Sequence, residues 1–180
     1  MSHEEYTDVL RATLKSQYHA ALAMLRETIE RCPDEVWLNK DHKNAFWQIA
    51  YHSLFFAHLY MQPNPEAFRP WEHHQSDVQN PDGLAGRPDP NSKLRLIPKP
   101  YTKSEVLAYW SLCDEMVDSA VDGMDLHSLN SGFYWYKVSK LEHQFVNIRH
   151  IQHHMAQLAD RLRASDDIGI QWVGARRKTD

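Results

Sequence analysis

Four of the chain's twelve histidines lie in one short stretch, Glu142–Leu158, at His143, His150, His153 and His154. His150 and His154 are four residues apart, and on a helix with about 100° per residue they project about 40° from each other. Two imidazoles placed in this way can direct one nitrogen each at the same metal ion. Two ligands do not make a tight protein site, so a third histidine must come from another helix.

This stretch is expected to form a helix, because its apolar residues recur at steps of three and four. Ser139-x-x-Glu142 matches a capping box at the start, and residues 166–169 contain the aspartates and glycine typical of a helix end. The histidine row, which Gln157 continues, lies about 120° or more around the helix from the apolar stripe. The stripe consists of Phe145, Ile148, Ile151, Met155, Leu158 and Leu162.

His52 is the candidate third ligand. It lies in the middle of residues 44–61, which are apolar nearly all round and therefore predict a buried, central helix. Asp41 or Asn44 is expected to cap that helix. A histidine in a core must satisfy both ring nitrogens, so a hydrogen-bonded core residue is the simpler interpretation of His52 taken alone. Ligation is favoured only when a histidine pair on another helix faces it.

A long first helix is predicted over residues 3–31. Ser2-x-x-Glu5 matches a capping box at its start, and Pro33 ends it because the residue before a proline is pushed out of helical geometry. His19 falls beside the apolar stripe of this helix. We interpret it as a boundary or surface histidine.

A third predicted helix starts at Thr102-x-x-Glu105, another capping box, and ends at Gly123. One face of this helix is apolar and is expected to pack on the other helices. Its carboxylates are expected on the solvent-exposed face, which carries Asp114, Glu115 and Asp118.

Residues 62–101, between the second and third predicted helices, are rich in proline and turn-forming residues and are not expected to be helical. Loops of this length within a compact domain are usually functional or disordered. About 40 residues easily span a helix roughly 30 Å long, so this segment can return the chain to the end where the second helix began. The two helices can then run parallel. We interpret His73 and His74 as surface residues in preference to a lid over the site.

Two other segments connect or end the helices. Residues 125–137 contain the aromatic run Phe133–Tyr136, which is expected to be a short extended piece or a wall of a cleft. Residues 168–174 are apolar enough to pack back onto the helices.

Composition excludes several classes of function. The 180 residues suit a single domain, 1–180, and the net charge of −4 gives no basic footprint for nucleic acid. The run 176–178 is interpreted as a solvated basic tail. Two cysteines, Cys32 and Cys113, do not make a disulfide framework, although one bridge between them stays open. With no signal pattern and no apolar run of membrane-spanning length, we expect a cytoplasmic protein without membrane contact.

The features above resemble one known family. Four predicted long helices, a long crossover, His52 in the second helix and the motif His150-x-x-His153-His154-x-x-Gln157-Leu in the fourth are similar to the DinB-like (YfiT-like) family of metal-dependent proteins. The resemblance covers essentially the whole chain, including the closing segment 171–174. One departure is Ala156, which stands where a glycine is common.

The resemblance implies an all-α four-helix bundle with a long crossover between helices 2 and 3, which run parallel. It also implies one divalent metal ion, either nickel, zinc or iron, held by one histidine of the second helix and two of the fourth. By position these ligands are His52, His150 and His154. The family further implies a homodimer, and some relatives transfer low-molecular-weight thiols.

We therefore expect a metal-dependent enzyme that transfers a small thiol to a small electrophile. Three imidazoles leave open positions on an ion, which can lower the pKa of a bound water or bind a thiolate. The alternatives are a non-catalytic metal-binding or stress-response module and a hydrolase that uses metal hydroxide. Neighbouring polar residues are expected to orient the ligands. These are Gln48, His143, Asn147, His153 and Gln157.

Overall fold

The computed structural model describes residues 2–39, 41–80 and 99–176 of the chain. Every regular element in these residues is helical, which confirms the predicted all-α class. A single turn of 3-10 helix at Pro65–Ala67 interrupts the segment that was expected to contain no helix. The α-helices are α1 (His3–Glu30), α2 (Asp34–Trp37), α3 (Phe46–Tyr60), α4 (Lys103–Asp122) and α5 (Lys140–Asp166).

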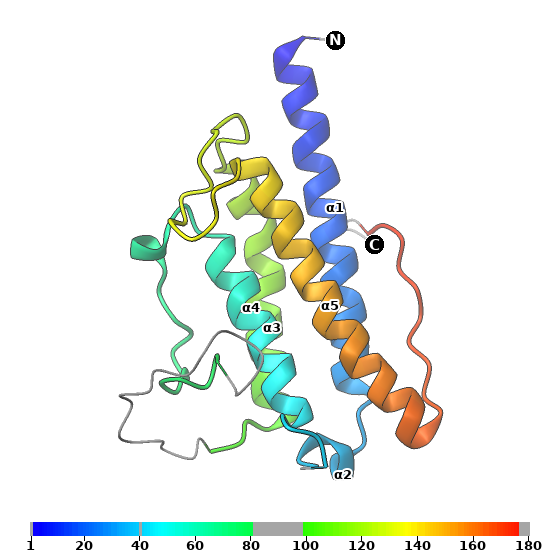
Figure 1. Cartoon of the computed structure of the whole chain (residues 1–180). Helices are drawn as coiled ribbons and strands as arrows, with labels where there is room; N and C mark the ends of the chain where they lie inside the picture. Colours follow the sequence, from blue (N-terminus) through cyan, green and yellow to red (C-terminus); the bar gives the residue numbers. More distant parts are fainter. Residues whose placement is uncertain (1, 40, 81–98, 177–180) are drawn as a thin grey trace.

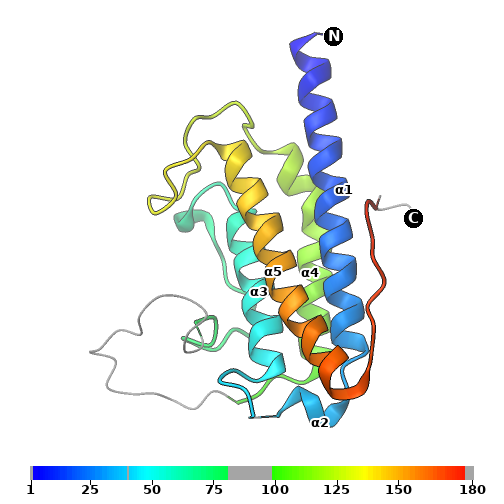
Figure 2. The same cartoon turned by 45° about the vertical axis from the view of Figure 1, so that its right-hand side comes forward.

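The four long helices lie side by side, as Figures 1 and 2 show, and α1 extends beyond the others at its amino-terminal end. Helix α3 packs against α4 and α5, and α1 packs against the same two helices from the other side. The apolar faces of all four meet in one core. None of the helices in the described part of the chain combines the length and hydropathy that a bilayer crossing demands.

Helices α3 and α4 run in the same direction. The ring of Tyr51 lies 5.4 Å from that of Tyr109, and one turn further along both helices the thiol of Cys113 lies 3.6 Å from the backbone oxygen of Leu54. Both helices begin at the end of the molecule where α2 lies (Figure 1). Of the connection between them, residues 81–98 lie outside the described part of the chain, as do residues 177 and 178 of the basic run.

The predicted capping boxes of α1 and α4 are confirmed. The Ser2 hydroxyl accepts from the Glu5 amide at 3.2 Å, and the Thr102 hydroxyl accepts from the Glu105 amide at the same distance. In both, the glutamate carboxylate accepts from the amide of the capping residue. At α5 the Ser139 hydroxyl accepts from the amide three residues later, at 3.1 Å.

The predicted cap of α3 was wrong. The helix begins two residues after Asn44, and Ala45 occupies the capping position. The side-chain oxygen of Gln48 accepts from the Ala45 amide at 2.8 Å, which satisfies the amide of the capping residue. The backbone oxygen of Asn44 instead accepts from Arg161 on α5 at 2.8 Å.

The link between α1 and α3 contains a helix that the sequence did not suggest, because four residues are too few for a periodic pattern. This helix, α2, buries Trp37. The indole of Trp37 donates to the backbone oxygen of Tyr101 at 2.8 Å, so α2 is bonded to the residue that precedes the capping residue of α4.

The interpretation of His19 as a boundary or surface residue was wrong, and two of the carboxylates predicted on the solvent-exposed face, Asp114 and Asp118, are only partly exposed. His19 is only 2% exposed. Its ring nitrogens lie 2.7 Å from Asp114 and 3.2 Å from Asp118, across the contact between α1 and α4. The hydrogen bond to Asp114 is the main cause of a raised pKa for His19. Glu115, in contrast, is exposed as expected.

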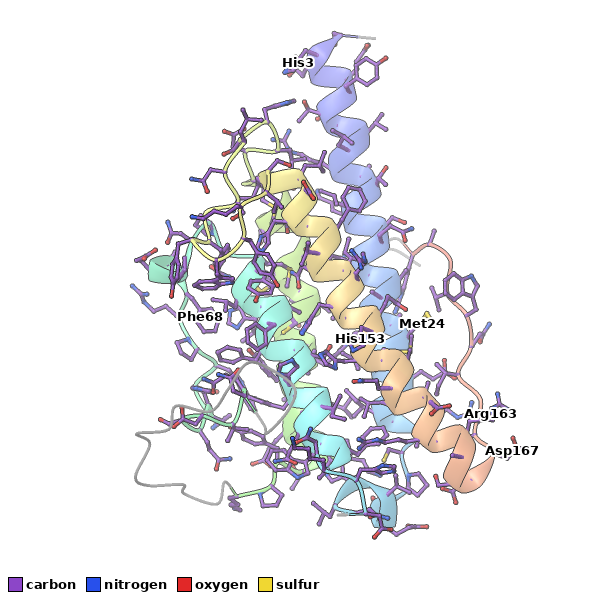
Figure 3. All side chains as sticks on the ribbon, in the orientation of Figure 1. His3, Met24, Phe68, His153, Arg163 and Asp167 are labelled. Atoms are coloured by element: carbon purple, nitrogen blue, oxygen red, sulfur yellow. The ribbon has the colours of Figure 1, made fainter. Side chains whose placement is uncertain are left out.

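At its carboxyl-terminal end α5 stops at Asp167, which adopts the left-handed conformation with φ of 52°. Arg163 lies 3.1 Å from the Asp167 carboxylate on this last turn (Figure 3). The tail beyond packs on the core, as predicted, through partly buried residues that include Ile170 and Val173. Phe145, placed in the buried stripe of α5 by its spacing, is instead 51% exposed.

Candidate metal centre

Three histidines converge where α3 faces α5. The Nε2 atom of His150 lies 3.1 Å from Nε2 of His52 and 3.1 Å from Nε2 of His154. One nitrogen from each of the three residues lies within 4.8 Å of the others, so the group can hold a metal ion. The structure therefore brings together all three residues that the sequence singled out. His52 and His154 are 1% and 3% exposed, and His150 is half-buried.

The outer nitrogens of two of these rings have partners that fix their protonation. The Nδ1 atom of His52 lies 2.6 Å from the backbone oxygen of Gln79. A carbonyl oxygen can only accept, so Nδ1 carries the proton and Nε2 of the neutral ring presents a lone pair. The Nδ1 atom of His154 is likewise 2.8 Å from the side-chain oxygen of Gln157, which leaves the same lone pair on its Nε2.

His150 cannot satisfy both neighbours with hydrogen bonds. A neutral His150 ring has one proton. On Nε2, this proton can donate fully to His52 or to His154 but not to both, so the lone pair of the other ring is left without a full donor. On Nδ1, it is buried without a partner among the described residues, and three lone pairs converge. A cation bound by the three Nε2 atoms removes the conflict.

The spacing fits a metal site. At the bond lengths of about 2.0–2.1 Å typical of zinc–imidazole sites, two nitrogens of a tetrahedral ion are about 3.3 Å apart. The two observed separations of 3.1 Å are close to that value. The donor set is three imidazoles, which suits zinc, nickel and iron and does not select among them.

Burial keeps these histidines neutral, as metal ligation requires. Desolvation is the main reason that the pKa of His52 falls to about 4 and that of His150 to about 3. The neighbouring imidazoles lower both values further. Desolvation also lowers the pKa of His154, and the hydrogen bond that its Nδ1 donates to Gln157 opposes this by raising it.

Only part of the predicted supporting shell lies at the site. Gln157 binds His154, as expected. His153, labelled on α5 in Figure 3, packs edge-on against the His154 ring at 4.9 Å. The prediction was wrong for Gln48, which caps α3, and for Asn147, whose amide donates to a backbone oxygen of α3 at 3.2 Å.

His143 is also separate from the three histidines, although it lies on the same side of α5. It is completely buried, and three aromatic rings surround its own at 4.8–4.9 Å between centroids. Neither of its nitrogens has a partner among the described residues. Two of the surrounding rings, Phe133 and Tyr136, come from the aromatic run. This run forms no strand in the described residues, and its rings pack around the His143 side chain. The third is Tyr60.

A residue that sequence reasoning missed is Gln79, because its backbone carbonyl has no residue-specific signal. The segment that carries it is fastened to α3, where Nδ1 of His74 lies 2.6 Å from the Tyr51 hydroxyl. His74 is half-buried, so its interpretation as a surface residue was wrong, whereas His73 is exposed. The apolar side of the site is closed by Phe56, whose ring centroid is 4.8 Å from that of His52.

The chain supplies no accessible thiol of its own. Cys32 and Cys113 are both unbridged and buried. Burial raises the pKa of Cys32 to about 12 and raises that of Cys113 as well. Neither cysteine is therefore a thiolate at neutral pH.

No protein-family model, curated protein or solved structure matches the chain.

Proposed function

We propose that this chain is a metal-dependent enzyme in which His52, His150 and His154 hold one divalent ion, either nickel, zinc or iron. One observation carries this proposal: three Nε2 atoms converge, and the partners of His52 and His154 turn a lone pair of each ring inward. A structural core histidine needs no such arrangement, because ordinary hydrogen-bond partners at its two ring nitrogens would satisfy it.

We further propose that the chain is a member of the DinB-like family, with one four-helix bundle domain over 1–180 and a long crossover over 62–101. The support is the histidine motif of α5, the partner histidine on α3, and the common direction of α3 and α4. Membership also suggests a homodimer in the cytoplasm.

The proposed reaction is transfer of a low-molecular-weight thiol to a small electrophile. When bound, an ion with open positions makes a thiol more acidic and so supplies the reactive thiolate. Because Cys32 and Cys113 are buried and protonated, the sulfur must come from a second substrate. The residues of the chain keep three imidazoles neutral and oriented, and Phe56 excludes water from one side. The half-buried edge at His150 is where a substrate can approach.

The first experiment is elemental analysis of tag-free protein, with His150→Ala beside the wild type. We expect close to one ion per chain in the wild type and loss of that ion in the variant. His153→Ala is the matched control, because it removes the neighbouring imidazole and leaves the three ligands in place. A folded wild type that binds no ion after reconstitution with nickel, zinc and iron would overturn the proposal.

The reaction is tested with the metal-loaded protein, a panel of small thiols and an activated aryl halide. We expect thiol to be consumed with metal and not without it. An ion bound without turnover of any substrate would favour the binding module. Metal-dependent ester hydrolysis that needs no thiol would favour the hydrolase.

A further inference from the structure

A hollow of about 650 Å³ lies between the end of α3, the carboxyl-terminal half of α4 and the start of α5. This size is within the range of sites for small molecules. Its lining includes the apolar residues Met61, Met116 and Met124 and the polar residues Ser128 and Lys140. It is separate from the histidines, because Lys140 precedes His150 by ten residues, or about 15 Å along α5.

Lys140 is unusual for a lysine because only 7% of its surface is exposed. Its ammonium donates to the backbone oxygen of Pro63 at 3.0 Å, a neutral acceptor that does not balance the charge. Among the described residues, no carboxylate forms an ion pair with it. Asp125, the acidic residue of the lining, is exposed and accepts from the His127 amide at 3.1 Å. A buried cation without a counter-charge is costly, so an anion from solution would be favoured there.

The lysine is held in position by a turn built for close approach. Gly132 has a φ of 88°, and a Cβ there would stand 2.0 Å from the Pro63 oxygen and 3.1 Å from Lys140 Nζ. The turn is fixed by the Asn130 side chain, which accepts from the Gly132 amide at 2.9 Å. The ring of Phe133 lies 5.5 Å from Nζ. The charge is therefore preorganised, which lowers the entropy cost of binding.

We infer that this hollow is a binding site for a small aliphatic carboxylate. The carboxylate meets the Lys140 ammonium, and the hydrocarbon body lies against Met61, Met116 and Met124, whose flexible side chains adapt to varied shapes. Desolvation lowers the pKa of Lys140 in the free protein, and a bound carboxylate opposes that change.

The test is calorimetric titration of the full chain with hexanoate and, in parallel, with hexanol, which has the same hydrocarbon body and no charge. We expect saturable hexanoate binding with a Kd between about 10 μM and 1 mM, and hexanol binding at least about tenfold weaker. Lys140→Met should weaken hexanoate binding about tenfold or more. Lys137→Met is the matched control, because Lys137 is an exposed lysine three residues away. This variant should bind hexanoate as tightly as the wild type does.

A second variant keeps the test independent of the folding of Lys140→Met. Ala120 is a partly buried residue of the same lining, so Ala120→Leu should fill the hollow and weaken hexanoate binding while the lysine stays in place. His150→Ala should leave hexanoate binding unchanged, which separates this proposal from the metal site. Equal binding of hexanoate and hexanol, or no saturable binding up to about 10 mM, would overturn the inference.

Discussion

The Nδ1 atom of His52 lies 2.6 Å from the backbone oxygen of Gln79, so a residue after α3 orients a candidate metal ligand on α3. The segment that contains Gln79, residues 73–79, is also hydrogen-bonded to Tyr101, just before the start of α4. The Tyr101 hydroxyl donates to the backbone oxygen of His73 at 2.7 Å and accepts from the Gln75 amide at 2.9 Å. The position of the segment and the orientation of His52 are therefore linked through hydrogen bonds that do not touch the ion.

Tyr101→Phe tests this link. Removing the hydroxyl frees the segment at two points, so the Gln79 oxygen should hold His52 less well and metal affinity should fall about three- to tenfold. The measurement is competition for zinc with a chromogenic chelator. Tyr134→Phe is the control, because that hydroxyl belongs to a side chain that is 75% exposed. Equal affinities for the wild type and Tyr101→Phe would show that the segment does not support the ligand.

Gln157→Ala tests the partner of His154. The side-chain oxygen that fixes the His154 ring is lost, and partners of this kind typically contribute 10- to 100-fold to metal affinity, so we expect a loss of about tenfold. Gln152→Ala is the control, because Gln152 is also a partly buried glutamine of α5 and contacts Met24 on α1. If the two variants lose metal affinity to the same extent, the loss is caused by a less stable α5 and not by a less well oriented His154.

The three histidines were predictable because their positions depend on local sequence. The spacing of His150 and His154 fixes their common face once α5 is helical, and the apolar surroundings of His52 indicate a central helix. What the sequence could not indicate was which backbone group would meet His52. The Gln79 carbonyl depends on the path of the chain after α3, and every residue type has a carbonyl.

The pairing of His19 with Asp114 and Asp118 shows a different limit. The two aspartates are four residues apart, so their common face was visible, but a carboxylate pair on a helix usually faces water. How far α1 covers them depends on the rotation of α1 against α4, which the periodicity of either helix alone does not determine. The exposed Phe145 has the same cause, because spacing predicts a stripe but not how far the neighbouring helices cover it.

His19 should make stability depend on pH in one direction. Its pKa is raised above the ordinary value of 6.5, chiefly by Asp114, so the protonated ring stabilises the folded state. This contribution is complete below about pH 6.5 and is lost as the pH rises through the folded-state pKa. Relative to the wild type, His19→Gln should lose about 1–2 kcal/mol of unfolding free energy near pH 5.5, and less near pH 9. Urea unfolding at both values is the measurement, and a pH-independent difference would contradict it.

His143 should act in the opposite direction. Desolvation, with a smaller effect from the charge of Lys140, lowers its pKa to about 4, so the unfolded state binds the proton more readily. Its stabilising neutral form is present above about pH 6.5, and stability is lost as the pH falls toward 4, by up to about 3 kcal/mol.

His143→Phe should remove that loss. Phenylalanine suits a site surrounded by aromatic rings and has no unpaired nitrogens to bury, so the variant should be at least as stable as the wild type at pH 7. Unfolding of the metal-free protein between pH 4 and 7 is the measurement, with the exposed His73→Phe as control. A variant that is less stable at pH 7 and equally acid-sensitive would refute the assignment.

Gly132→Ala should destabilise the protein by about 2–4 kcal/mol, because the residue has a positive φ and a Cβ would collide with the Pro63 oxygen at 2.0 Å. Thermal unfolding gives the measurement. Gly123→Ala is the control, because Gly123 ends α4 with a φ of −80° and its nearest neighbour would be 3.4 Å from the new Cβ. That change should stay within about 1 kcal/mol of the wild type. Because the turn also holds Lys140, Gly132→Ala should weaken hexanoate binding as well. A Gly132→Ala variant with the stability of the wild type would show that the turn is not rigid enough to position the Lys140 ammonium.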